Sequence, residues 1–305
     1  MPNVSFVPSR ISRYSLKVIQ FLAVMLVGGG ELSATPLDDA MELFAERRYA
    51  EAEEAFTQLE QEFPDHPQVL LYLGKLAAKR HDQKTSLQYL DRAMELRPND
   101  AEMNFEYGAA CGQYAATLGT SFSALSHARR ASKAILRAIE LDPSNLSYRQ
   151  GMIGFSLNAP AIAGGGHKRA KAQADAIAKI NPTQGAYAHA GIHRAQGDHG
   201  AALKSLDALI AISPDNYHAL FNFGRCAAES GERLEEGLVH LQTCLTLPAP
   251  DRAAPPAEVW WKIATIKKRQ NDRDAAIHAL EQAVALAPTH RHIADDLKRF
   301  LAEES

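Results

Sequence analysis

A proline recurs along this chain at intervals of about 34 residues, and the same kind of segment precedes each one. The prolines are Pro64, Pro98, Pro143, Pro182, Pro214, Pro248 and Pro288. Proline cannot continue an α-helix, because it lacks the backbone N–H and its ring clashes with the preceding turn. A period of this length is typical of short helical units that stack side by side, and it favours a binding surface over a pocket for chemistry.

Three columns of residues repeat before these prolines. The first column is small: Ala52, Ser86, Ala131, Ala170, Ala202, Gly237 and Ala276. Four residues later stand Phe56, Leu90, Ile135, Ala174, Leu206, Leu241 and Leu280, and three residues beyond those stand Leu59, Ala93, Ala138, Ile177, Leu209, Cys244 and Ala283. Offsets of four and three lie on one stripe of an α-helix, so the columns predict a buried face on which a second helix packs closely.

A second helical stretch lies upstream of each small column. Its pattern is large, two residues, large, small, as in residues 70–74, 220–224 and 260–264, while Asn104 breaks the pattern in residues 104–108. The small member marks the expected contact between paired helices. In residues 95–100, 140–145 and 211–216, the polar residues after the proline predict a turn and an N-cap for the next helix.

These residues resemble the tetratricopeptide repeat family, whose units are helix–turn–helix hairpins of 34 residues. The resemblance covers the chain from about residue 35 to residue 288. It implies an all-α fold, an α-solenoid of about seven hairpins. Residues 290–305 predict a polar-faced helix that caps the last hairpin, because the end of a solenoid needs such a cover.

Several units depart from the regular length. Extra chain lies at residues 114–130 and at residues 159–167, where the sequence is APAIAGGGH. The small and large columns of one unit, Gly237 and Leu241, come one residue late, and the linker 249–258 precedes the last unit. We expect these departures to change local geometry and leave the architecture intact.

The first 34 residues form a different kind of segment. Arg10, Arg13 and Lys17 precede an apolar run over residues 18–27, and small residues follow up to Ala34. This order is that of a secretory signal peptide, and the apolar run is well short of the roughly 20 residues needed to span a bilayer. We therefore expect a signal peptide at 1–34, a repeat domain at 35–305 with no membrane span after cleavage, and export, most simply to the periplasm. An uncleaved membrane anchor and a transit peptide are the alternatives.

Net charge and cysteine count argue against two classes of protein, nucleic-acid-binding proteins and disulfide-stabilised scaffolds. The formal net charge is −3 at pH 7, which argues against a dedicated nucleic-acid-binding protein. Three cysteines are too few for a disulfide framework. Cys226 and Cys244 fall on the two helices of one hairpin but should point apart, so we expect buried, unpaired thiols.

No residue pattern predicts catalysis or a cofactor. His189 and His193 stand four apart, a spacing that suits two metal ligands on one helical face, and His199 is a conceivable third ligand. The zinc-peptidase pattern needs glutamate directly after the first histidine, where this chain has Ala190. Core or interface histidines are the favoured interpretation, and no metal site is assigned. Residues 164–168 (GGGHK) lack the Walker spacing and are interpreted as a glycine hinge.

The family resemblance also implies which residues face the concave groove of the solenoid. One groove position holds Leu71, Phe105, Gln150, Tyr187, Phe221 and Trp261, and cations follow on the same or an adjacent stripe at Lys75, Lys79, Arg194, Arg225, Lys268 and Arg269. Aromatic side chains beside cations suit an extended peptide with apolar and acidic side chains. The predicted peptide-binding groove consists of Leu71, Lys75, Phe105, Tyr187, Arg194, Phe221, Arg225, Trp261 and Lys268. The alternative is that these side chains only pack on neighbouring hairpins.

The sequence therefore predicts a non-catalytic scaffold or adaptor of the cell envelope that binds a protein or an extended peptide. The alternative is an accessory subunit of an envelope enzyme, export or transport complex, in which His189 and His193 could bind a metal. The cations Lys75, Lys79 and Arg225 do not reproduce the carboxylate clamp of chaperone-binding members of the family, so that ligand is not implied.

Overall fold

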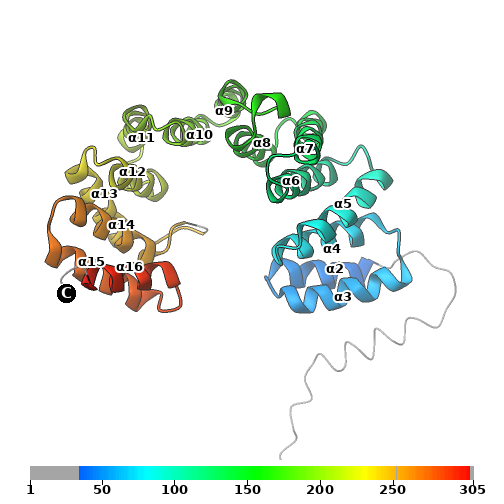
Figure 1. The fold of residues 1–305 in the computed structure, drawn as a ribbon, viewed down its shortest axis with the longest axis horizontal. Helices are drawn as coiled ribbons and strands as arrows, with labels where there is room; N and C mark the ends of the chain where they lie inside the picture. The colour runs from blue at the N-terminus through cyan, green and yellow to red at the C-terminus, as the bar shows by residue number, and fades with distance from the viewer. Residues whose placement is uncertain (1–33, 252, 303–305) are drawn as a thin grey trace, which may run out of the picture. The chain divides into compact units, whose positions relative to one another are not determined.

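The structure is a computed structural model that describes residues 34–251 and 253–302. The predicted signal peptide falls almost wholly outside these residues, so its existence and the 34/35 boundary stay predictions. The described residues form fifteen α-helices and one 3-10 helix, with no strand among them. The helices divide between Gly119 and Thr120 into two units, which we describe separately (Figure 1).

The first unit, which ends at Gly119, contains two complete hairpins and one further helix. Its helices are α2 (Ala34–Ala45), α3 (Tyr49–Glu62), α4 (Pro67–Lys79), α5 (Gln83–Leu96) and α6 (Ala101–Thr117). Each helix packs on the next one along the chain, and the first helix of one repeat, α4, also contacts the first helix of the next, α6.

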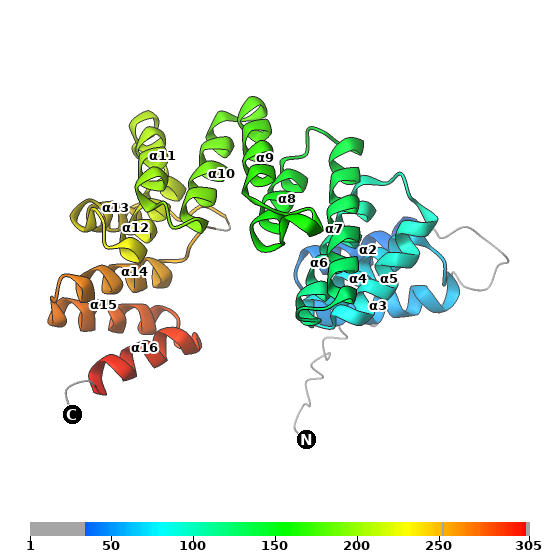
Figure 2. The same ribbon diagram turned by 45° about the horizontal axis from the view of Figure 1, so that its top comes forward.

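The second unit begins with α7, contains four hairpins and ends with a single helix (Figure 2). Its helices are α7 (Phe122–Leu141), α8 (Leu146–Asn158), η2 (Ala161–Ala163), α9 (His167–Ile180), α10 (Pro182–Ala195), α11 (His199–Ile212), α12 (Tyr217–Ser230), α13 (Leu234–Thr246), α14 (Pro256–Arg269), α15 (Arg273–Leu286) and α16 (Arg291–Ala302). The predicted all-α solenoid is confirmed: consecutive helices pack in pairs, and α16 covers α15 as a terminal cap. None of the described helices is both long and apolar enough to span a bilayer.

The three repeated columns form the core of both units. All of their residues are buried, and the least buried of the apolar ones, Leu209, is 5% exposed. The expected close approach of paired helices is also confirmed. A Cβ atom at Gly74 would overlap Leu90 of the partner helix, and one at Gly224 would overlap Leu241. The lack of a side chain at these two glycines lets their helices approach this closely.

Helix ends follow the predicted chemistry. Each second helix of a hairpin ends two residues before its proline, and Pro182 both closes α9 and begins α10 without a turn between them. Asp100, Asn145 and Asn216 are N-caps whose side chains accept a hydrogen bond from a backbone N–H of the first turn. The predicted caps after Pro98, Pro143 and Pro214 are therefore confirmed.

The turn inside the hairpin has a recurrent left-handed residue. Arg47, His81, Gly197 and Asn271 occupy the middle of three-residue turns with φ between 56° and 76°. In each turn the next residue donates its N–H to a carbonyl five residues earlier, as Asp82 does to Ala77. Three of the four left-handed positions are not glycine, so these turns carry backbone strain.

The two inserted segments take different forms. Extra residues near 114–130 lengthen helices: α6 has 17 residues and α7 has 20. Residues 159–167 instead form η2 and a glycine loop, in which the Gly166 N–H donates to the Ser156 carbonyl at 2.7 Å. The loop is fixed to α7, because Arg129 Nε donates to the Ile162 carbonyl at 3.1 Å. It is therefore a packed element of the second unit.

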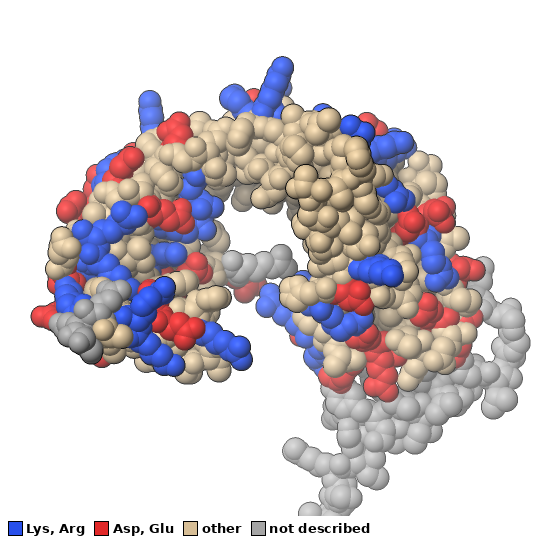
Figure 3. Space-filling model, in the orientation of Figure 1, with Lys and Arg blue, Asp and Glu red and all other residues tan. Residues whose placement is uncertain are grey.

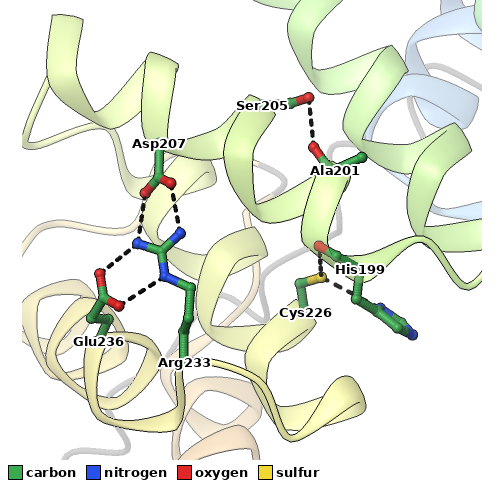
Figure 4. Close-up of polar contacts among 7 residues, drawn as sticks. All are labelled: His199, Ala201, Ser205, Asp207, Cys226, Arg233 and Glu236. Atoms are coloured by element: carbon green, nitrogen blue, oxygen red, sulfur yellow. Dashed lines mark hydrogen bonds and ion pairs between the residues drawn. The ribbon is translucent and has the colours of Figure 1, made fainter.

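Arg233 positions the start of α13, the helix whose column residues Gly237 and Leu241 come one residue late. It has a left-handed backbone with φ 51° and immediately precedes α13. Its guanidinium donates to Asp207 of α11 at 2.6 and 3.1 Å and to Glu236 at 2.8 Å (Figure 4), and it lies over the Phe223 ring at 4.7 Å. These contacts fix the start of α13, which sets the positions of Gly237 and Leu241.

Candidate functional site

In the second unit, the first helices of successive hairpins lie along one side, which we call the inner face. Helix α8 contacts α10, and α12 contacts α14. Figure 1 shows α10 and α12 on this inner side, with α11 on the outer side. Helices α10 and α12 do not pack as closely on each other, and a cavity opens at this place.

The cavity has a volume of about 280 Å³ and lies among α10, α11 and α12. Its apolar part is formed by Ala190, Ala202, Leu206 and Cys226, and its polar part by Gln184, Tyr187, Arg194, His218, Asn222 and Arg225. Three of the predicted groove residues, Tyr187, Arg194 and Arg225, therefore line one cavity. Two of its lining residues are arginines and none is acidic.

Arg225 is the less satisfied of the two arginines. Its Nη2 donates to Asn222 Oδ1 at 2.6 Å, while its Nε is buried and has no hydrogen-bond partner within the described parts of the chain. The pKa of Arg225 lies below its ordinary value, because the side chain is largely buried and because Arg194 carries the same charge. The protein thus holds a guanidinium here in a place that disfavours positive charge.

Arg194 has an acidic partner. Its Nη1 lies 3.1 Å from Glu229 Oε2, and its Nε is likewise buried without a partner in the described residues. Basic and acidic side chains are interspersed on the face seen in Figure 3, in line with the small net charge. The excess of positive charge is therefore a local property of the cavity.

Hydrogen bonds hold the other polar side chains of the cavity. The Tyr187 hydroxyl donates to Asn216 Oδ1 at 2.6 Å, and Asn216 in turn caps α12. Gln150 of α8 donates to Gln184 at 3.2 Å, and Gln150 is exposed. The inner face from α8 to α12 therefore offers amide groups that are joined along the stack.

The predicted groove residues of the first unit are occupied by internal contacts. Lys75 Nζ lies 2.8 Å from Glu102 Oε1 and 3.4 Å from Glu106 Oε1. Burial opposes the charge on Lys75, but the Glu106 and Glu102 carboxylates outweigh it and raise the pKa of Lys75. Leu71 is fully buried, and Phe105 is half-buried.

Helix α16 engages two further predicted groove residues. Trp261 Nε1 donates to Asp296 Oδ2 at 2.9 Å, and Lys268 Nζ donates to Asp296 Oδ1 at 3.0 Å. Lys268 also lies over the Phe300 ring at 4.3 Å. Phe221 is only 6% exposed, so it supports the packing of α12.

The three histidines of interest do not converge. His189 pairs with Asp175 at 3.0 Å, and His193 lies 3.7 Å from Asp198. His199 Nδ1 lies 3.5 Å from Cys226 Sγ (Figure 4). Within the described residues no group of three metal-ligating side chains forms.

The cysteines have the predicted state. All three are buried, none of them forms a disulfide bond, and no bridge joins Cys226 to Cys244. Burial raises the pKa of Cys226 to about 11 and that of Cys244 to about 12. The thiol of Cys226 beside His199 stays protonated near neutral pH and lacks the lowered pKa of an activated nucleophile.

Sequence reasoning missed the acidic partners of its predicted cations. Glu102, Glu106 and Asp296 sit on the first helices that follow α4 and α14, four residues apart in the case of the two glutamates. Applying the repeat register to acids as well as to cations would have placed Glu102 and Glu106 opposite Lys75, and Asp296 opposite Lys268. The cavity itself had no signal in the sequence, because it depends on the spacing of α10 and α12.

Comparisons with known proteins agree with this architecture. Models of the tetratricopeptide repeat family match residues 43–109, 187–238 and 257–290, which together span about half of the chain. No curated protein matches the sequence.

Solved structures show the same fold at low sequence identity. A tetratricopeptide repeat protein from Parabacteroides merdae is 12% identical, with a TM-score of 0.61, and the match covers 88% of this chain and 98% of that one. A match at 16% identity to the APC/C hetero-tetramer Cut9–Hcn1 has a TM-score of 0.50 and covers 95% of this chain and 53% of that one. With the repeated columns, the hairpins and the family models in agreement, the chain belongs to the tetratricopeptide repeat family.

Proposed function

We propose that this protein is an exported, non-catalytic adaptor that binds an extended segment of a partner protein along the inner face of its second unit. Tetratricopeptide repeat proteins act generally as protein-interaction scaffolds, which supports the broad class. The observation that carries the proposal is the cavity among α10, α11 and α12, with Tyr187, Arg194 and Arg225 in its wall.

Several features of the inner face suit an extended ligand. The cavity supplies apolar surface for a side chain, and Gln150 and Gln184 supply amide groups along the stack. Polar groups beside apolar pockets are how proteins recognise extended chains. A related fold also occurs in the Cut9–Hcn1 hetero-tetramer, in which it is part of a protein complex.

Export is the second component of the proposal. It is supported by the basic, apolar and small order of residues 1–34. N-terminal sequencing of protein from its native host tests it: the mature chain should begin near Thr35 and be recovered from the envelope compartment. A cytosolic chain that begins at Met1 would overturn export.

Site-specific photo-crosslinking tests the binding face. A photoreactive residue at exposed Gln150 or half-buried Asn222, both on first helices, should crosslink to the partner in cells. The same residue at Val239, which is 56% exposed on the second helix α13, is the matched control. Crosslinks from Val239 with none from the first helices would place binding elsewhere and refute the proposal.

A further inference from the structure

We infer that the cavity among α10, α11 and α12 receives one acidic side chain of the bound partner, with Arg225 as its main recognising group. The inference rests on the proposed function and names the chemistry of one anchor within it. The cavity offers a cationic wall and no carboxylate of its own.

Arg225 is poised for such a partner because its own chain does not supply one at close range. Among the described residues it makes no ion pair, its one side-chain bond goes to a neutral amide, and its Nε–H is unused. Glu229 and Glu258 attract it only at longer range, while Arg194 repels it. A guanidinium presents a fork of N–H donors that matches a carboxylate and binds it through charge-assisted hydrogen bonds.

The repeat register shows how the surroundings of this arginine differ from those of a paired cation. Lys75 and Arg225 hold the same position, directly after Gly74 and Gly224. Lys75 is neutralised by Glu102 and Glu106 of the next first helix, α6. In α14 the equivalent residues are Glu258 and Lys262, so a lysine replaces the second glutamate.

The shape of the cavity favours a side chain with an apolar stem. Ala190, Ala202, Leu206 and Cys226 line its apolar part, and Arg194 and Arg225 line its cationic part. Glutamate combines methylene groups with a terminal carboxylate, so it satisfies both parts. The stack of first helices continues on both sides, through α8 and through α14, which suits a side chain of a passing segment better than a chain end.

Nuclear magnetic resonance of arginine Nε–H groups tests the inference on the purified protein. The probe is N-acetyl-glutamic acid α-amide, which carries a single side-chain carboxylate, and the neutral control is N-acetyl-glutamine amide. The Arg225 Nε–H resonance should shift saturably with the glutamate probe. The glutamine probe should bind at least about tenfold more weakly, because the loss of one charge-assisted hydrogen bond lowers affinity by about a factor of ten.

Variants separate recognition from folding. In both variants of Arg225 the resonance of the Arg194 Nε–H group reports binding. Arg225→Gln should abolish saturable binding. Arg225→Lys should retain part of it, because the positive charge remains although the fork of N–H donors is lost. Arg97→Gln, at an exposed position of the first unit, is the matched control and should leave binding unchanged. Circular dichroism of each variant verifies that the helices remain.

Three results would overturn the inference. They are an absence of saturable shifts at both arginines, equal binding of the two probes, and stronger binding of N-acetyl-glutamine, whose only carboxylate is a chain end. Failure here with crosslinks still at Gln150 and Asn222 refutes only the acidic anchor. Probe binding with crosslinks confined to Val239 refutes only the proposed inner-face function.

Discussion

Lys75 of the first unit and Arg225 of the second occupy the same place in their repeats, yet their surroundings differ. Both follow a glycine at a tight helix contact, but Lys75 contacts the next first helix, α6, whereas Arg225 lines the cavity beside α10. Lys75 has two glutamates within 3.4 Å, and its pKa is raised above its ordinary value. Arg225 has only an amide within hydrogen-bonding distance and lies over the Phe221 ring at 5.9 Å, and its pKa is lowered.

The comparison separates packing from recognition. The glycine contacts are equivalent because the repeat needs them to hold its helices together. The charges differ in part because neighbouring first helices carry different residues at one position, Glu106 in α6 and Lys262 in α14, and that position does not affect the hairpin core. In the first unit Lys75 stabilises the fold through internal ion pairs, whereas in the second unit Arg225 remains available to a ligand.

The largest predicted effect tests the shared packing. Gly74→Val and Gly224→Val should each destabilise their unit by about 3 kcal/mol, because the new side chain overpacks against Leu90 or Leu241. Thermal unfolding followed by circular dichroism measures this. Gly154→Val is the matched control, since nothing lies within 4 Å of a Cβ atom at that helical glycine. Similar losses in all three variants would mean that the close approach is not the cause.

The next effect tests the difference in charge. Lys75→Met should lower the free energy of unfolding by about 1–2 kcal/mol, because it leaves Glu102 and Glu106 beside each other without their cation. Arg225→Met should cost nothing or stabilise slightly, because it removes a poorly compensated buried charge. Urea unfolding of both variants decides the matter. Equal losses would contradict the comparison.

A smaller effect concerns Asp296, which pairs with the third cation, Lys268. Burial opposes the ionised form of Asp296, but hydrogen bonds from Trp261 and Lys268 outweigh it and lower its pKa. A lowered folded pKa gives stability above the unfolded value of about 3.9, and that stability is lost as the pH falls through the folded value. Asp296→Asn should therefore cost roughly 1 kcal/mol at pH 6 and less at pH 3.

Tryptophan fluorescence during urea unfolding reports on this region, because Trp261 contacts Asp296 directly. Asp295→Asn is the control, at the neighbouring residue of α16. A gap between Asp296→Asn and the wild type that stays constant from pH 6 to pH 3 would show that the carboxylate is not responsible.

The smallest predicted effect comes from a substitution that makes the surroundings of Arg225 more like those of Lys75. Lys262→Glu restores the glutamate that stands opposite Lys75 in α6, and it should stabilise the second unit by about 0.5 kcal/mol. It should also weaken binding of the glutamate probe, because Arg225 gains an internal carboxylate. Lys262→Gln removes the same lysine without adding an acid and should leave probe binding close to that of the wild type. Unchanged probe binding in Lys262→Glu would argue against the register that links the two regions.

Much of the fold follows from local residue patterns. Ala52, Leu90 and Ala276 mark buried faces because helical spacing alone puts them on one stripe, and Asp100 and Asn216 mark helix starts because capping is a local interaction. The division near Gly119 and the packed form of residues 159–167 could not be predicted in this way. Both depend on contacts between segments distant in the chain, such as Arg129 with Ile162.

The candidate site was predictable only in part. The register identified Tyr187, Arg194 and Arg225, which line the cavity. It could not tell that Leu71 is fully buried or that Asp296 of the capping helix holds Trp261 and Lys268. Whether a cation is free depends on side chains from another helix, and the pattern within one repeat does not contain that information.

The strained hairpin turns have a consequence for how this protein can change. Arg47, His81 and Asn271 adopt the left-handed backbone that Gly197 adopts at the same place in its hairpin. Each non-glycine residue in that conformation forgoes up to about 1–2 kcal/mol, so single substitutions to glycine offer a reserve of stability that the present sequence does not use. Such a reserve would let inner-face residues mutate toward new ligands while the repeats stay folded. The recognition specificity of this chain can thus evolve faster than its architecture.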